Sequence, residues 1–386
     1  MYELVPACLR GRDGTLVFGL VPAWAWRRDT GATRGPLRLS VMNRRFLVSL
    51  PLAAALAVSA SVSAGSSSAS SSADPESVTP AWGASLPLTL AVLGDAPYGA
   101  EQVAAFPDLI ADVNGDPRVH QVIHLGDIKT GSSSCTDEYF RHIATEFERF
   151  RDPLIYTPGD NEWTDCHRPA AGGYDPLERL EVLRSQFFAE PGAALGVRPM
   201  VLETQAVDPA HAAFVENTRW ASAQVAFATV HAVGSDNGLA PWFGGNETPE
   251  QTRLREAEVR ARTDAALSWI DDTFDAAEER GLRGVVISMQ ADTFAGGGSA
   301  GYTEIVRRLA DRSRAFDGEV LLLQGDTHRY LVDRPLAEGH EGYGISEPVT
   351  NLTRIVVEGE TVSEWLRLTV NPTAEQLFSW QRVPVD

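Results

Sequence analysis

Four short apolar segments of this sequence end in a Gly-Asp pair, and this repeated ending constrains the fold more than any other feature. In an α/β sheet, the carboxyl ends of neighbouring strands meet at one edge, where ligands bind, and glycine lets the backbone turn sharply there. Four carboxylates at one edge would repel one another unless cations lay between them. We therefore predict a metal site at the carboxyl ends of the strands. The four segments are Leu93-Gly94-Asp95, Leu125-Gly126-Asp127, Pro158-Gly159-Asp160 and Gln324-Gly325-Asp326.

Short apolar runs alternate with helical patterns over residues 85–386, and no internal repeat is visible. This alternation predicts one layered α/β domain with two sheets, which ends in antiparallel strands beyond residue 340. Strands are expected over 88–93, 121–125, 154–157, 224–232, 284–289, 319–323, 354–358, 364–370 and 376–380. Helices are expected over 100–113, 139–149, 176–188, 248–280 and 302–316.

The charge balance narrows the classes of function. The chain has 33 basic and 52 acidic residues and a formal net charge of −19, whereas a nucleic-acid scaffold would carry a basic face. An acidic surface repels phosphate, so phosphate chemistry would require a local cation. The single lysine, Lys129, follows Asp127 by two residues. It is either a phosphate contact or a balancing charge for the carboxylates, or else an ordinary surface lysine.

The amino-terminal part of the chain has a pattern of its own. A basic segment, an apolar run and small residues at a cleavage position follow one another at 42–45, 46–60 and 61–64. This order predicts a secretory signal peptide over 42–64. The alternative, a membrane anchor, is disfavoured because the apolar run is short, contains Pro51 and ends in serines. We expect residues 1–41 to be a misassigned or disordered extension and residues 65–84 to be a Ser/Ala-rich linker. The protein should then be exported to the periplasm or the extracellular space, without a stable membrane anchor after cleavage.

Two cysteines remain after the predicted cleavage, Cys135 and Cys166. An exported chain with two cysteines favours one disulfide, and two free buried thiols are the alternative. Cys135 falls eight residues after Asp127, and Cys166 six residues after Asp160. If those two strands are adjacent, both loops leave the same edge of the sheet, and a bridge between them is geometrically reasonable.

From Leu88 onward, the order of the motifs resembles the calcineurin-like metallophosphoesterase superfamily, as a divergent member. That family reads Asp-x-His, Gly-Asp, Gly-Asn-His-Asp/Glu, a strand-end His and Gly-His-x-His. The matching segments are 95–97, 126–127, 159–162, 288–290 and 325–328. The resemblance implies a layered α-β-β-α sandwich with two mixed sheets.

The resemblance also implies two divalent metal ions, which share Asp127 as a bridging ligand. One ion would be held by Asp95, Asp127 and His328, and the other by Asp127, Asp160, Gln290 and Asp326. Several positions depart from the family, because Pro97, Asp160, Gln290 and Asp326 stand where it has His or Asn. The second site would consist of oxygen ligands alone, which favours Mg²⁺, Mn²⁺ or Ca²⁺ over Zn²⁺.

The activity implied by the resemblance is hydrolysis of a small-molecule phosphomonoester or phosphodiester by a hydroxide activated between two metal ions. The family's His after the Asn ligand corresponds to Asn161, which can hydrogen-bond a phosphate oxygen but cannot act as an acid. Proton transfer would then fall to Glu162, His167 or water. The alternative is a catalytically degenerate metal-binding protein on the same fold, acting as a binding module. The sequence predicts neither the substrate's identity nor the oligomeric state.

Overall fold

The computed structural model describes residues 4–10, 16–22 and 86–385. The first two segments form β1 (Leu4–Arg10) and β2 (Leu16–Pro22), an antiparallel pair that the sequence pattern does not predict. They belong to a compact unit distinct from the one that contains residues 86–385. The predicted signal peptide (42–64) and linker (65–84) lie outside the described residues. None of the described helices has the length and apolarity needed to span a membrane.

The larger of two sheets in the main unit has seven strands in the order β11-β12-β10-β9-β8-β7-β6. Its central strands β8, β9, β10 and β12 run parallel, and β6, β7 and β11 extend it by antiparallel pairing. The strands are β6 (Glu203–Thr204), β7 (Thr218–Ser222), β8 (Val225–Thr229), β9 (Gly284–Ser288), β10 (Glu319–Gln324), β11 (Leu331–Asp333) and β12 (Leu352–Val356).

The smaller sheet has five strands in the order β14-β13-β3-β4-β5. Strands β3, β4 and β5 run parallel, whereas β13 pairs antiparallel with both β3 and β14. The strands are β3 (Leu88–Leu93), β4 (Val119–His124), β5 (Leu154–Tyr156), β13 (Glu364–Val370) and β14 (Phe378–Pro384).

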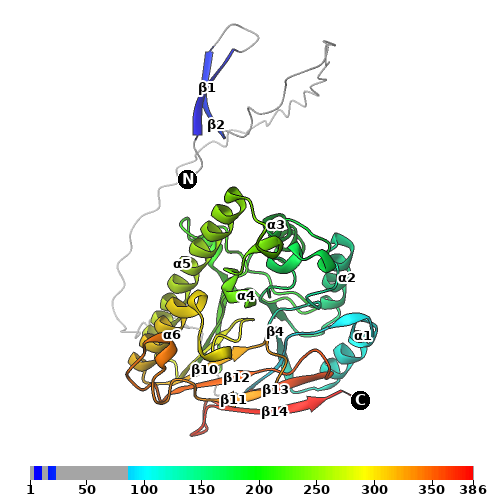
Figure 1. Ribbon diagram of the computed structural model, residues 1–386. Coiled ribbons are helices and arrows are strands. Elements are labelled where there is room, and N and C mark those ends of the chain that lie inside the picture. The colour runs from blue at the N-terminus through cyan, green and yellow to red at the C-terminus, as the bar shows by residue number, and fades with distance from the viewer. Residues whose placement is uncertain (1–3, 11–15, 23–85, 386) are drawn as a thin grey trace, which may run out of the picture. The chain divides into compact units, whose positions relative to one another are not determined.

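The two sheets pack face to face, and helices cover their outer faces (Figure 1). Side chains from both sheets, such as Leu90 of β3 and Phe227 of β8, form the apolar layer between them. Helices α5 (Pro249–Glu279) and α6 (Thr303–Ala315) cover the larger sheet, and the smaller sheet is covered by α1 (Gly99–Gly115), α2 (Asp137–Phe147) and α3 (Pro176–Phe187). The predicted α-β-β-α sandwich with two mixed sheets is confirmed.

Local sequence signals explain where the longest helix begins. The Thr248 hydroxyl accepts from the backbone N–H of Gln251 at 3.2 Å, and the Gln251 side chain accepts from the backbone N–H of Thr248 at 2.8 Å. This capping box satisfies backbone donors that would otherwise have no partner. Pro249 lies in the first turn, where a backbone N–H would have no partner within the helix, so its missing N–H costs no hydrogen bond.

Within residues 86–385, the sequence pattern misses three strands and the direction of one. Strand β6 has two residues, and β7 and the edge strand β11 are only partly buried, so none of them forms an apolar run. Strand β12 lies parallel to β10, whereas strands beyond residue 340 were expected to be antiparallel. Because the two strands run parallel, the carboxyl end of β12 lies beside the carboxyl end of β10, where the site described below begins.

Candidate metal centre

The four predicted strand-end aspartates lie where β3, β4, β5 and β10 end, and their neighbouring glycines allow close packing. A Cβ atom at Gly159 would overlap the carboxylate of Asp127, and one at Gly325 would lie 2.6 Å from Oδ2 of Asp95. Asp95, Asp127 and Asp326 have φ values of 51°, 55° and 76°. This left-handed conformation is uncommon outside glycine, though less so for aspartate. The chain therefore adopts strained turns that place carboxylates side by side.

The structure brings these carboxylates into two clusters that share one residue. Ligand atoms of Asp95, Asp127 and His328 all lie within 4.8 Å of one another, and so do those of Asp127, Asp160 and Asp326. Asp95, Asp127 and Asp160 are buried, with exposed fractions of 0%, 1% and 6%. The first cluster presents carboxylate oxygens and an imidazole nitrogen, and the second presents carboxylate oxygens alone, at spacings that could hold a metal ion.

The electrostatics of the clusters fit cations. Burial, followed by repulsion from Asp326, raises the pKa of Asp95 well above its usual range. Burial, followed by repulsion from Asp160, acts in the same direction on the pKa of Asp127 and raises the pKa of Asp326 to about 7. Within residues 86–385, no lysine or arginine forms an ion pair with any of these carboxylates. Divalent ions would supply the missing positive charge.

The buried Gln290 differs from its expected role as a ligand. Its Oε1 accepts from the backbone N–H of Gly234 at 2.6 Å. Its amide nitrogen donates to Oδ1 of Asp326 at 3.0 Å and lies 3.5 Å from Oδ1 of Asp160. The backbone of Gly234 therefore turns the nitrogen of Gln290, and not its oxygen, toward the carboxylates, and an amide nitrogen is a donor without ligand capacity.

A hydrogen-bond network organises the cluster around Asp127. The Tyr98 hydroxyl donates to Oδ2 of Asp127 at 2.8 Å and lies 3.1 Å from Nε2 of His328. The Asn161 amide donates both to the Tyr98 hydroxyl, at 2.7 Å, and to Oδ2 of Asp127, at 2.8 Å. Nδ1 of His328 lies 2.9 Å from the Glu360 carboxylate.

Sequence reasoning gave Tyr98 and Glu360 no role. Tyr98 could have been noticed in the sequence because it directly follows Pro97, which stands where the resembled motif has His. No sequence motif includes Glu360. Burial, and after it the charge of Asp127, raises the pKa of the Tyr98 hydroxyl. Tyr98 therefore stays a hydrogen-bond donor at neutral pH.

Glu162, which was expected to transfer protons, is buried away from the cleft. One carboxylate oxygen accepts from the backbone N–H groups of Asp127 and Gly159, at 3.1 and 2.6 Å, and from the Tyr156 hydroxyl at 2.7 Å. Its side chain is fully buried. Glu162 thus joins the loops that follow β4 and β5, and it does not line the cleft.

Lys129 and His167 do not line the cleft either. Lys129 is fully buried, so it is not a surface lysine. Its ammonium donates to the backbone carbonyls of Thr130 and Asn161, at 2.8 and 2.7 Å, and burial lowers its pKa to about 8. Nδ1 of His167 accepts from the backbone N–H of Phe243 at 2.8 Å. Of the four residues expected to act in catalysis, only Asn161 lines the cleft.

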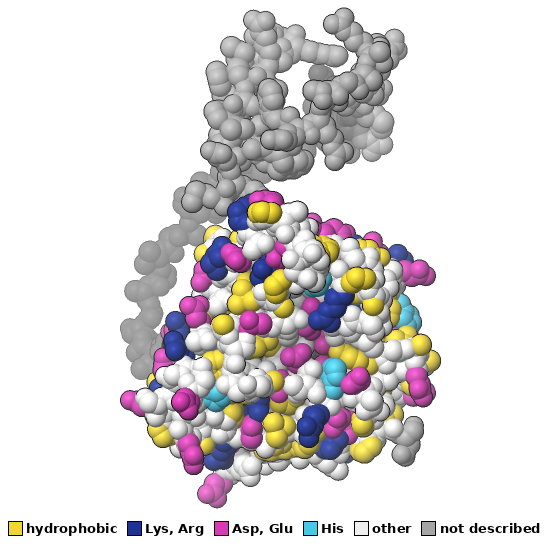
Figure 2. Space-filling model, in the orientation of Figure 1, with side chains coloured by type: hydrophobic (Ala, Val, Ile, Leu, Met, Phe, Trp, Pro, Cys, Tyr) yellow, Lys and Arg dark blue, Asp and Glu magenta, His cyan; other side chains and the backbone are white. Residues whose placement is uncertain are grey.

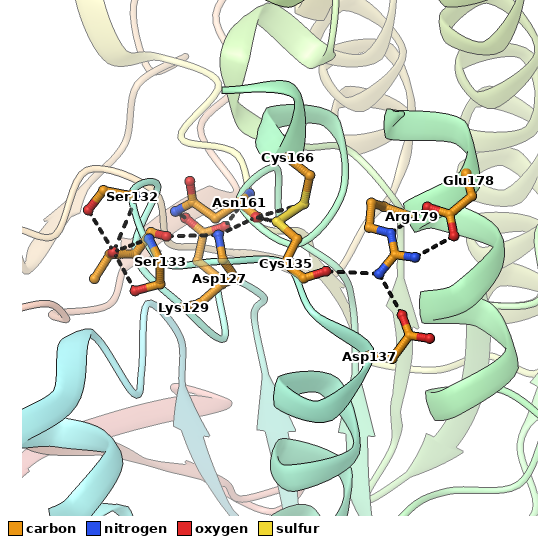
Figure 3. Close-up of a disulfide and its surroundings, with 11 residues drawn as sticks. Asp127, Lys129, Ser132, Ser133, Cys135, Asp137, Asn161, Cys166, Glu178 and Arg179 are labelled. Carbon is orange, nitrogen blue, oxygen red and sulfur yellow. Dashed lines mark hydrogen bonds and ion pairs between the residues drawn. A yellow bond between two sulfur atoms is a disulfide. The ribbon is translucent and has the colours of Figure 1, made fainter. Parts of the chain in front are cut away.

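The predicted disulfide between Cys135 and Cys166 is present, and free thiols are excluded as the alternative (Figure 3). It joins the segment after β4 to the 3₁₀ helix η2 (Thr164–His167), which follows Asp160. The two sulfur atoms lie 3.5 and 3.6 Å from the carbonyl oxygen of Asn161. Arg179 of α3 donates to the carbonyl of Cys135 at 2.8 Å, so the bridge is anchored to a helix. The disulfide braces the loop that carries Asn161.

The clusters open into a cleft of about 350 Å³. Acidic side chains, the hydroxyls of Thr130 and Ser132, and one arginine, Arg168, line it. The Arg168 guanidinium pairs with Asp165 at 2.5 Å, and its side chain is 44% exposed. A Cβ atom at Gly131 would lie 2.7 Å from Nη1 of Arg168, so glycine leaves room for the guanidinium. Figure 2 shows acidic and basic side chains interspersed over one face, without a continuous basic patch there.

Comparisons with known proteins give distant structural neighbours. No family model matches the sequence, and no curated protein matches it. A dimetal phosphatase from Danio rerio is 12% identical, covering 78% of this chain and 99% of its own, at a TM-score of 0.44. A purple acid phosphatase from yellow lupin is 11% identical, over 78% and 54% of the two chains, at 0.41. A 5'-nucleotidase from Candida albicans is 10% identical, over 78% and 51%, at 0.38.

Proposed function

We propose that this protein is an exported metal-dependent phosphoesterase that hydrolyses a small-molecule phosphomonoester or phosphodiester with two divalent ions. The observation that carries the proposal is the position of Asp127. Its carboxylate lies within 4.8 Å both of the Asp95 and His328 ligand atoms and of those of Asp160 and Asp326. A residue shared by two clusters would bring two cations close together, as in two-metal sites.

Bound divalent ions would neutralise phosphoryl oxygens and lower the pKa of a water molecule. Asp95, Asp127, Asp160, Asp326 and His328 would hold them, and the oxygen-rich set favours Mg²⁺, Mn²⁺ or Ca²⁺ over Zn²⁺. Tyr98 keeps the Asp127 carboxylate in place through its hydrogen bond of 2.8 Å.

Arg168 supplies the local cation that an acidic protein needs to attract phosphate. The Arg168 guanidinium and the Asn161 side chain both lie against Gly131. A Cβ atom added at Gly131 would lie 2.7 Å from Nη1 of Arg168 and 2.9 Å from Oδ1 of Asn161, so the two side chains are neighbours in the cleft. A phosphoryl group in the cleft can therefore accept charge-assisted hydrogen bonds from Arg168. Because Glu162 and His167 do not line the cleft, water is the one remaining proton source for the leaving group among the three that the sequence suggested. Substrates with good leaving groups should react fastest.

A panel of aryl phosphomonoesters and phosphodiesters, tested across Mn²⁺, Mg²⁺, Ca²⁺ and Zn²⁺ with elemental analysis of the purified protein, tests this proposal. We expect turnover that chelation abolishes and one of the first three ions restores. Stoichiometric metal binding without turnover on any substrate would instead favour a metal-stabilised binding protein. The feature that favours this second candidate is Asn161, which stands where a family member would have His and cannot act as an acid.

A further inference from the structure

The two carboxylate clusters differ in the side chain that completes each of them, His328 in the first and Gln290 in the second. The first cluster is completed by His328, whose Nε2 lies 3.5 Å from Oδ1 of Asp95 and can offer a lone pair to a cation. The second is completed by the Gln290 amide nitrogen, which lies 3.0 Å from Oδ1 of Asp326 and 3.5 Å from Oδ1 of Asp160. That nitrogen offers two hydrogens and no lone pair. It therefore stabilises the paired carboxylates itself and repels a cation placed between them.

The orientation of this amide is set by the backbone. The Gly234 N–H points at Oε1 of Gln290 over 2.6 Å, and a backbone N–H can only donate. A flipped amide would bring two donors together and turn its oxygen toward two carboxylates. Gln290 has no exposed surface, so water could not relieve either contact, and each unmade hydrogen bond would be costly.

The segment that carries Gly234 is itself packed against the second cluster. A Cβ atom at Gly234 would lie 2.6 Å from both Oδ2 of Asp160 and Oδ1 of Asp326. The Ser235 hydroxyl lies 2.9 Å from Oδ2 of Asp160. The same hydroxyl lies 2.9 Å from Oδ1 of Asp165, so its one hydrogen is shared between the two carboxylates. An ion entering here must displace or reorient the Gln290 amide and this hydroxyl.

We infer that Gln290 makes the two cation sites unequal: the Asp95–Asp127–His328 cluster binds its ion tightly, and the Asp127–Asp160–Asp326 cluster binds a second ion weakly. This inference rests on the proposed metal centre and specifies its loading. At low metal concentration the protein would hold one ion. The second would enter at higher concentration, or when phosphoryl oxygens of a substrate add ligands that the protein lacks.

Titration of the chelator-treated full chain with Mn²⁺ tests the inference without any assay of activity. Calorimetry gives the two dissociation constants, elemental analysis gives the stoichiometry, and electron paramagnetic resonance distinguishes single ions from coupled pairs. We expect the second ion to bind on the order of 100-fold more weakly than the first, because changes in the groups around a metal ligand commonly alter metal affinity by up to that factor. Gln290→Glu places an oxygen where the nitrogen now lies, so it should bring the two constants closer together.

Gln205→Glu is the matched control, because Gln205 is equally buried but hydrogen-bonds Ala265 and Asn217, away from the clusters. It should leave the ratio of the two constants unchanged. Gln290→His provides an imidazole instead and serves if Gln290→Glu does not fold. Two ions that bind the wild-type protein within about tenfold of each other, or a ratio that neither Gln290 variant changes, would overturn the inference. Failure to bind any ion would overturn the proposed metal centre and this inference with it.

Discussion

The hydroxyl of Tyr98 donates a hydrogen bond of 2.8 Å to Oδ2 of Asp127, the residue that both carboxylate clusters share. Residues that orient metal ligands in this way typically contribute 10- to 100-fold to metal affinity, so we expect Tyr98→Phe to weaken Mn²⁺ binding by about that factor. The ring remains, so the fold should persist. Tyr139→Phe is the control, because that hydroxyl donates to a backbone carbonyl, that of Ile128. Equal Mn²⁺ affinity in Tyr98→Phe and the wild type would exclude this role.

Arg168 should affect the substrate and not the metal. Loss of a charge-assisted hydrogen bond costs about 1.5–3 kcal/mol, so Arg168→Gln should raise the KM for an aryl phosphate by roughly 10- to 100-fold. Mn²⁺ affinity should stay at the wild-type value. Arg253→Gln, which removes an arginine paired with Glu250 on an exposed surface, is the control. An unchanged KM in steady-state kinetics would show that Arg168 does not contact the phosphoryl group.

The carboxylate clusters should make the stability of the metal-free protein fall as the pH rises. The pKa of Asp326 is about 7 in the folded, metal-free protein, raised by burial and then by Asp160, whereas an unfolded aspartate has a pKa of about 3.9. Folding then takes up a proton between these values. The Tm of the metal-free protein should therefore fall as the pH rises from about 4 to about 7.

A bound cation replaces that proton, so metal binding should release protons and protect more strongly at higher pH. Differential scanning calorimetry with and without Mn²⁺ should show an increase in Tm that grows from about pH 5 to about pH 7. A metal-induced increase that shrinks over this range would contradict the sign of the raised pKa values.

The disulfide should stabilise the fold as well as the loop that carries Asn161. Cys135 and Cys166 are separated by 31 residues, and cross-links of this length commonly contribute about 2–4 kcal/mol. The double variant Cys135→Ser/Cys166→Ser should unfold at correspondingly lower denaturant concentration, and its Tm should not respond to a reductant. A non-reduced digest of the wild type should yield a linked peptide pair. Two alkylatable thiols in that digest would refute the bridge.

The strand-end aspartates were predictable because their signal is local. A Gly-Asp pair after a buried strand places a small residue where a carboxylate must approach, as Gly159 does for Asp127. The orientation of Gln290 was not predictable, since it depends on Gly234, a residue 56 positions earlier in the chain. The burial of Lys129 depends likewise on the Asn161 carbonyl, in another loop. Side-chain roles set by backbone groups from distant segments leave no trace in a linear motif.

Metal-dependent turnover of the wild type beside Asp127→Ala tests the central proposal most directly, because Asp127 is the residue common to both clusters. The exposed Asp311, which pairs only with Arg314 in the described structure, provides the control Asp311→Ala. We expect Mn²⁺, Mg²⁺ or Ca²⁺ to restore aryl phosphate hydrolysis in the wild type and in Asp311→Ala. Asp127→Ala should bind less metal and show no restored turnover. Equal hydrolysis by Asp127→Ala and the wild type, or turnover that chelation does not affect, would contradict a phosphoesterase centred on Asp127.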